Sequence, residues 1–298
     1  MRTLLTTSLL LLLLGSCTQY AYYQSPLQAN TNPYRTLPRI SEDQPSAIYA
    51  SGSYTIGSAN DDARDQVKAF SGSVYRAHQF NWFQAYYGAN GHLGYYKVGQ
   101  ITGLDPYFHT NQNMNDSLIN TMRGKKSFGS WGAIGGVNLV MPLSNRSEWR
   151  MIGTDLSWNK EFGHYLDFRN KLPDTAANYI ERNDQFFTIS LYTDLVLAAK
   201  KGTFGMKWAM VYHPRSLDGF DTKRKPMTLH PNYFAFTLHY TNNRITGFWQ
   251  ANISPYANSV QLGANIRLSK LSTLIPLRQQ PYEPSSLPGT RRRSSVYR

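Results

Sequence analysis

Residues 185–197 read QFFTISLYTDLVL, and this stretch decides the fold class. One set of alternate positions is apolar apart from Thr193, and its members are Phe187, Ile189, Leu191, Leu195 and Leu197. The positions between them start with Thr188, Ser190, Tyr192 and Asp194. A repeat of two residues predicts a β-strand with one apolar face and one more polar face.

The same alternation recurs along the second half of the chain. It is regular in residues 203–213 (TFGMKWAMVYH), 232–240 (NYFAFTLHY) and 258–269 (NSVQLGANIRLS). Weaker alternation predicts strands at 47–57, 67–87, 92–101, 129–141, 148–159 and 244–254. The parity of 67–87 breaks near His78, so this stretch is either one bulged strand or two. Counted once, it brings the total to about ten strands.

The links between these strands alternate in length. Long links cover 58–66, 102–128, 160–183 and 214–230, and short links cover 88–91, 142–147, 199–201 and 242–243. The last link, 255–257, is short where a long one is expected. Tight turns at one end and long loops at the other resemble outer-membrane β-barrels in general, over residues 47–269. We therefore predict an all-β fold, an antiparallel up-and-down transmembrane β-barrel of about 10 strands.

Composition agrees with a sheet that has one face in lipid. Charged residues make up 16% and aromatic residues 14% of the 298 residues, with a mean hydropathy of -0.47. These values exclude a helical membrane protein but leave a second reading open. In that reading the chain is a soluble periplasmic lipoprotein, a β-sandwich or calycin-like barrel with its apolar face turned inward around a core or an apolar ligand.

The N-terminus carries a targeting signal. Arg2 precedes an apolar run that ends in LLLLLLGSC, residues 9–17, which is too short to span a membrane. Leu14-Gly15-Ser16-Cys17 resembles the lipobox of bacterial lipoproteins. The resemblance implies a signal peptide over 1–16, lipidation of Cys17, and delivery to the outer membrane because Thr18 rather than Asp follows the cysteine.

Two segments lie outside the predicted barrel. Residues 17–46 hold four prolines without periodicity, and we predict a lipid-anchored, Pro-rich, extended tether. Residues 270–298 are basic and rich in Pro and Ser, and we predict a disordered tail. With an even number of strands and the first link outside the cell, both termini are expected in the periplasm.

The sequence offers no catalytic motif: GxSxG, HExxH, a P-loop and paired metal motifs are all missing, and no cofactor or metal is expected. Charged residues instead occur on the polar faces of the strands, at Asp155, Asp194, Lys207, His239 and Arg267. In a barrel these positions face the lumen, where opposite charges pair because an isolated buried charge is costly. A weaker interpretation uses His239 as a general base oriented by Asp194 or Asp155, but no nucleophile stands out.

The formal net charge of +13 favours anionic partners. For an exported protein these are outer-membrane lipid and lipopolysaccharide rather than nucleic acid, with an envelope protein as a further candidate partner. Basic residues cluster in three long links, at Lys125 and Lys126, at Arg169 and Lys171, and at Lys223, Arg224 and Lys225. The sequence thus predicts a lipid-anchored, non-enzymatic protein of the cell outer membrane with a structural, assembly or surface-binding role.

Overall fold

A computed structural model describes residues 22–29, 32–39, 46–59, 65–99, 123–172, 174, 177, 179–220, 225–254 and 257–269. The predicted signal peptide, Cys17 and the basic tail over 270–298 lie outside the described residues. Among the helices that are described, none combines the length and apolar character that crossing a membrane requires.

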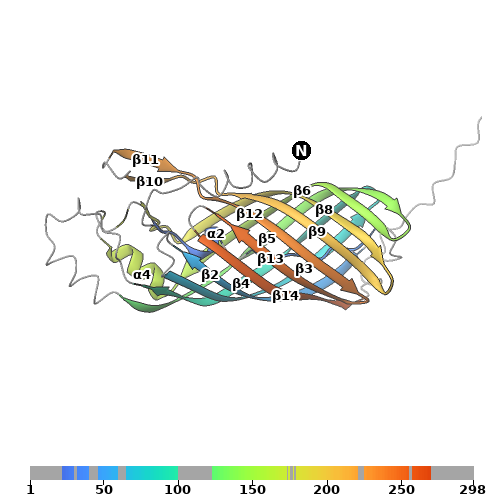
Figure 1. Ribbon diagram of the computed structural model, residues 1–298, viewed down its shortest axis with the longest axis horizontal. Coiled ribbons are helices and arrows are strands. Elements are labelled where there is room, and N and C mark those ends of the chain that lie inside the picture. The colour runs from blue at the N-terminus through green and yellow to red at the C-terminus, as the bar shows by residue number, and fades with distance from the viewer. Residues whose placement is uncertain are drawn as a thin grey trace, which may run out of the picture.

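Ten strands form a closed antiparallel barrel, and each of them pairs with the wall strands that come before and after it in the chain (Figure 1). They are β2 (Ser46–Ala59), β3 (Asp65–Phe80), β4 (Phe83–Val98), β5 (Gly124–Ser144), β6 (Ser147–Phe162), β8 (Gln185–Ala199), β9 (Gly202–Tyr212), β12 (Asn232–Asn242), β13 (Ile245–Ile253) and β14 (Ala257–Ser269). Pairing of β14 with β2 joins the last strand to the first. The predicted all-β, up-and-down barrel of ten strands is confirmed.

Four tight turns lie at one end of the barrel, on the right in Figure 1. Two of them place Asn81 and Asn243 at positive φ, of 39° and 50°, as the twist of a two-residue hairpin requires. The predicted short link at 88–91 is wrong, because those residues continue β4. Residues 67–87 therefore contain a hairpin that turns at Asn81 and Trp82, and the parity break near His78 marks its approach.

The long links gather at the opposite end and carry secondary structure of their own (Figure 1). The additional elements are α4 (His164–Lys171), β7 (Tyr179–Ile180), β10 (Leu217–Phe220) and β11 (Pro226–Leu229), together with β1 (Tyr22–Tyr23) and α2 (Pro26–Ala29) from the N-terminal segment. A small sheet in the order β1-β7-β10-β11 joins the N-terminal segment to two of the links. We call this sheet with α4 the loop cap.

The apolar face of every regular strand points outward. Leu191, Met210 and Leu262 are 58%, 64% and 61% exposed, and alternate residues on the same strands are buried. The soluble alternative needs residues such as Phe204 and Ile266 inside the barrel, yet both are exposed on its outer surface. The lumen instead receives the polar face, so the outside of this barrel is more apolar than its inside.

Candidate functional site: the filled lumen

Residues 32–39 of the predicted tether lie inside the barrel, whereas Tyr22 and Tyr23 belong to the loop cap. Residues 33–38 are all buried, and the chain passes from the loop cap through the lumen to the end with the tight turns. A tether that only links the lipid to the first strand is therefore not what the structure shows, because the lumen supplies polar partners for a backbone that has no sheet to join.

Alternate carbonyls of the segment accept hydrogen bonds from side chains of the barrel wall. The four bonds run from Gln250 Nε2 to Asn32 O (2.9 Å), Asn265 Nδ2 to Tyr34 O (3.2 Å), Tyr75 OH to Thr36 O (3.0 Å) and Gln84 Nε2 to Pro38 O (2.6 Å). A spacing of two residues shows that the segment runs extended, with these carbonyls on one side. Buried backbone groups need such partners, so the amides and hydroxyls of the wall fix the segment in one register.

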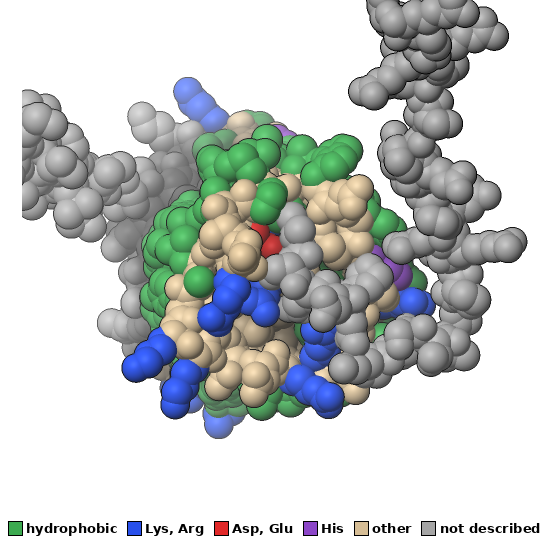
Figure 2. Space-filling view, turned by 90° about the vertical axis from the view of Figure 1, so that its right-hand side faces the viewer, with side chains coloured by type: hydrophobic (Ala, Val, Ile, Leu, Met, Phe, Trp, Pro, Cys, Tyr) green, Lys and Arg blue, Asp and Glu red, His purple; other side chains and the backbone are tan. Residues whose placement is uncertain are grey.

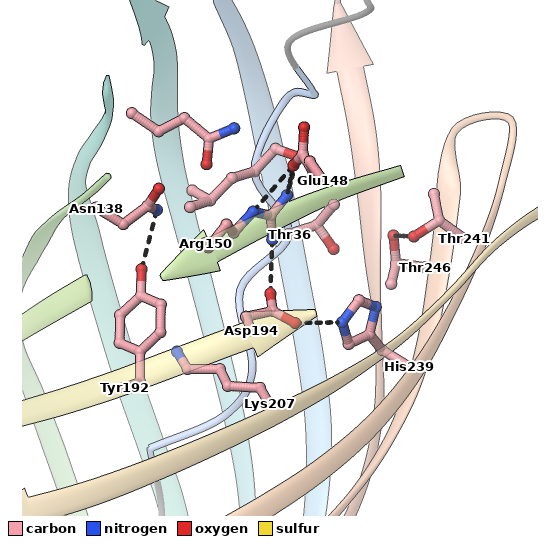
Figure 3. A network of polar contacts seen from close by, with 12 residues as sticks. Thr36, Asn138, Glu148, Arg150, Tyr192, Asp194, Lys207, His239, Thr241 and Thr246 are labelled. Carbon is pink, nitrogen blue, oxygen red and sulfur yellow. Dashed lines mark hydrogen bonds and ion pairs between the residues drawn. The ribbon is translucent and has the colours of Figure 1, made fainter. Parts of the chain in front are cut away.

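Arg150 occupies the centre of one lumen cluster (Figure 3). Its guanidinium contacts Asp194 Oδ2 at 2.7 Å and Glu148 Oε1 at 2.8 Å, and it also donates to the carbonyl of Leu37 at 3.3 Å. Asp194 in turn contacts His239 Nε2 at 3.0 Å. These side chains are buried, so the cluster links three wall strands to the threaded segment through charged groups that solvent does not screen.

A second cluster forms around Asp155, which was predicted to face the lumen. Lys207 Nζ lies 2.8 Å from Asp155 Oδ2, and the hydroxyl of Tyr86 donates to Oδ1 at 2.6 Å. Tyr86 also accepts from Arg35 Nη1 of the threaded segment at 3.4 Å. Lys207 further lies 3.5 Å from the centre of the Tyr192 ring, a cation–π contact. Arg35 thus brings a positive charge from the segment to the wall carboxylate.

The structure brings four of the five predicted lumen residues into pairs, Asp155 with Lys207 and Asp194 with His239. The fifth, Arg267, borders the same cavity as Arg150 and His239 near the tight turns. Sequence reasoning missed Arg150 itself. Its position has the opposite parity to Asp155 on β6, and both face inward only because the register shifts between Arg150 and Gly153. The sequence signal for it was its spacing from Glu148, because residues two apart in a strand share a face and opposite charges there can pair.

His239 does not have the surroundings of a catalytic base. Its ring stacks on Tyr34 with 4.3 Å between ring centres and is 3% exposed, so Tyr34 covers the face that a substrate would approach. The Nδ1 atom has no hydrogen-bond partner among the described residues. Within that same part of the chain, no group of three His, Cys, Asp or Glu side chains is placed to hold a metal ion.

The threaded segment leaves little space in the lumen. Two cavities border it, one of about 30 Å³ beside Tyr34 and Arg35 and one of about 20 Å³ beside Leu37 and Arg39. By this measure a single water needs roughly 10–15 Å³. Each cavity therefore has room for one or two water molecules and for no larger solute.

The loop cap closes the end of the barrel where the segment enters. Tyr22 stacks on Tyr179 with 5.2 Å between ring centres, and Tyr23 packs edge-on against Phe168 at 5.3 Å. Tyr23 is buried, which raises its pKa above the ordinary value for tyrosine. The first residues of the described chain are thus part of the cap itself.

In the predicted basic cluster at Arg169 and Lys171, Lys171 is exposed but Arg169 is not available for binding. Arg169 is 0% exposed and contacts Glu161 Oε2 at 2.7 Å inside the cap. Lys125 and Lys126 lie over the rings of Tyr95 and Phe168, with their charge near the surface. Lys223 and Arg224 lie outside the described residues.

Comparisons with known proteins give no family. A scan against protein-family models finds no match, and neither does a search of curated proteins. Among solved structures, the chain is similar to the translocator domain of the autotransporter NalP from Neisseria meningitidis (10% identity, TM-score 0.37, 75% of this chain and 88% of that one). It is also similar to an outer membrane channel from Pseudomonas putida F1 (7%, 0.37, 78% and 100%) and to the transport unit of the autotransporter AIDA-I from Escherichia coli (9%, 0.36, 78% and 93%). Likeness at these scores carries no inference about function.

Proposed function

We propose that this protein is an integral, lipid-anchored barrel of the outer membrane whose lumen is closed by its own N-terminal segment. In this proposal it acts through its ends as a structural, assembly or surface-binding component, and it neither conducts solutes nor catalyses a reaction. Residues 33–38, buried within the lumen, are the observation that carries the proposal.

The apolar exterior supports insertion into a membrane. Large apolar side chains such as Ile152, Leu191 and Met210 cover the middle of the outer surface. Aromatic side chains lie nearer the two ends, with Trp82 and Phe80 at the tight turns and Trp131 and Phe187 toward the loop cap. A closed barrel with an apolar band between aromatic girdles satisfies every wall hydrogen bond without water. Tyr86, by contrast, is buried and faces the lumen.

The tight turns and their charges support an orientation. Three of the four tight turns carry exposed Arg or Lys side chains, at Arg146, at Lys200 and Lys201, and at Arg244. Figure 2 looks onto this end and shows Lys and Arg side chains around its rim. Barrels of this class place short turns in the periplasm and long loops outside the cell. We propose the same orientation here, with turn cations against lipid phosphates and the loop cap facing lipopolysaccharide or a partner protein.

Reconstitution into liposomes tests the closed lumen. Purified protein is expected to leave the liposomes impermeable to a monosaccharide, as followed by osmotic swelling. A variant with Tyr34, Arg35 and Leu37 replaced by glycine is expected to raise permeability, because these side chains fill the space beside both cavities.

The matched control is Leu217→Gly, a buried change in β10 of the loop cap rather than in the lumen. Folding of each protein is checked by a heat-dependent shift in gel mobility. Swelling with the unchanged protein would overturn the proposal, as would equal impermeability of all three folded proteins at the level of protein-free liposomes, which would show that the segment is not what closes the lumen.

A further inference from the structure

We infer that the barrel threads its own N-terminus to the end that carries the long loops, so that the acyl chains on Cys17 enter the membrane leaflet on the loop side. This inference rests on the proposed function for lipidation and membrane insertion. It departs from the sequence-based expectation that both termini lie in the periplasm.

The two described ends of the chain lie at opposite ends of the barrel. Ser46 and Ser269, which begin and end the wall, both lie at the tight turns, as an even number of strands requires. Residues 32–39, which precede the wall in the chain, however, lie within the lumen. Pro38 contacts Gln84 near the turn, whereas Tyr22 pairs with Tyr179 in the loop cap.

The direction of threading follows from contacts at successive depths. His213, which directly follows β9 at the loop end, hydrogen-bonds through Nε2 to the carbonyl of Gln28. The side-chain amide of Asn32 donates from Nδ2 to Thr188 Oγ1 at 3.3 Å, near the start of β8. The carbonyl of Leu37 accepts a hydrogen bond from Arg150 near the tight turns. The chain therefore passes once through the barrel, and its earlier residues are the ones nearer the loops.

Five further contacts hold the first described residues in the cap. They are the parallel pairing of β1 with β7, the stacking of Tyr22 on Tyr179, the bond from Glu181 N to Tyr23 O (2.9 Å), the bond from Tyr165 OH to Gln24 O (3.1 Å) and the bond from Gln28 Nε2 to Glu181 Oε2 (3.3 Å). Ser25 and Leu27 are fully buried between them. The N-terminal segment is thus a structural part of the cap rather than a strand that crosses it loosely.

Chain length then limits where the lipid can lie. Cys17 is five residues before Tyr22, and five fully extended residues reach at most about 18 Å. The apolar band of an outer-membrane barrel is about 25 Å tall, so a lipid on Cys17 cannot reach the leaflet at the tight turns. The leaflet beside the loop cap is the one within reach. In the proposed orientation this is the outer leaflet, and the barrel carries a lipidated N-terminus to the cell surface.

Single-cysteine labelling on intact cells tests this arrangement, because Cys17 is the only cysteine in the chain and lipidation blocks its sulfur. Gln19→Cys, Asp174→Cys in a long loop and Lys201→Cys in a tight turn are each treated with a membrane-impermeant maleimide. We expect Q19C and D174C to be labelled on intact cells and K201C only after the outer membrane is permeabilised. Q19C that behaves like K201C would overturn the inference.

A disulfide test examines the position of the N-terminus without depending on whether a maleimide can reach the cysteine. Tyr22→Cys with Tyr179→Cys places two cysteines at paired positions, and we expect them to form a disulfide in the membrane-inserted protein. Tyr22→Cys with Lys201→Cys is the control and is not expected to do so. A free Y22C/Y179C pair under oxidising conditions would show that the N-terminus is not held in the cap.

Failure of the proposed function gives different results. If D174C is protected and K201C is labelled on intact cells, the proposed orientation is wrong, while grouping of Q19C with D174C still supports the threading. If the unchanged protein reacts with maleimide at Cys17 after detergent extraction, lipidation is wrong. The Y22C/Y179C disulfide still decides the path of the chain in either case.

Discussion

Arg150 contacts two buried carboxylates in the lumen, and its replacement removes one positive charge from beside each of them. Arg150→Met keeps much of the side-chain volume and removes the contacts at 2.7 and 2.8 Å to Asp194 and Glu148. Breaking a buried ion pair from one side costs roughly 3–5 kcal/mol, because the partner charge remains buried. We expect the urea midpoint of the detergent-solubilised barrel to fall accordingly.

The control for this change is Lys201→Met in an exposed turn, which is expected to change the stability by less than about 0.5 kcal/mol. Combining Arg150→Met with Glu148→Gln and Asp194→Asn removes the charges that Arg150 balances. This triple variant is expected to recover part of the loss. A single variant as stable as the unchanged protein would show that the cluster does not hold the lumen together.

His213 gives the barrel a dependence of stability on pH. Burial lowers the pKa of His213 to about 4, against 6.5 in an unfolded chain. Between these values the unfolded chain binds a proton and the folded protein does not, so stability is complete above pH 6.5 and is lost as the pH falls toward 4. At pH 5 the loss from this residue is expected to be about 2 kcal/mol.

The measurement compares urea midpoints at pH 7 and pH 5 for the unchanged protein and for His213→Gln. A glutamine amide can still donate to the carbonyl of Gln28 but does not titrate in this range. We expect the drop between the two pH values to be smaller in H213Q. Equal drops in the two proteins would mean that His213 is protonated in the folded state as readily as in the unfolded one.

At the scale of the strands, glycine allows neighbouring elements to approach. A Cβ added at Gly88 in β4 would lie 2.3 Å from the carbonyl oxygen of Val74 and 2.5 Å from the Cβ of Tyr75. Gly247 in β13 has nothing within 4 Å of the same position. Gly88 is therefore needed for pairing of β3 with β4, which explains why a glycine that suggested a turn lies within a strand.

Two substitutions with alanine test this difference. Gly88→Ala is expected to destabilise the barrel by about 1–3 kcal/mol or to reduce the fraction that folds, because strand backbone cannot move aside as a flexible side chain does. Gly247→Ala is expected to be neutral. The fraction with the folded gel mobility after refolding reports both effects, and equal behaviour of the two variants would contradict the assigned packing.

At the scale of the whole molecule, the apolar outer surface distinguishes a membrane protein from a soluble one. Leu191 lies near the middle of β8 on the outward face, and Gln185 lies on the same face at the loop end of that strand. An arginine at the bilayer midplane costs roughly 2–4 kcal/mol, and near an interface roughly 0–1 kcal/mol. We expect Leu191→Arg to lower the free energy of unfolding measured in lipid vesicles. Gln185→Arg is expected to leave that free energy almost unchanged. A soluble protein would tolerate both.

Much of the wall was predictable because strand signals are local. The alternation in 185–197 and 203–213 assigns each residue to one of two faces, and the link lengths then indicate an up-and-down barrel. The charges at Asp155 and Asp194 could be placed in the lumen by parity. The hairpin at Asn81 was missed because the glycines of 88–91 resemble a turn, whereas close pairing with β3 is what requires Gly88.

The sequence by itself determined which face of each strand is apolar, how many strands there are and where most of them turn, because these features depend on side chains two residues apart. Only the tertiary structure decided that the outer surface is the apolar one and that residues 32–39 fill the lumen. The physical reason is that this segment has no periodicity of its own. Its partners are Gln250 and Asn265 from β13 and β14, and Tyr75 and Gln84 from β3 and β4. Closure of the barrel between β14 and β2 is what brings these two distant pairs of strands to the segment.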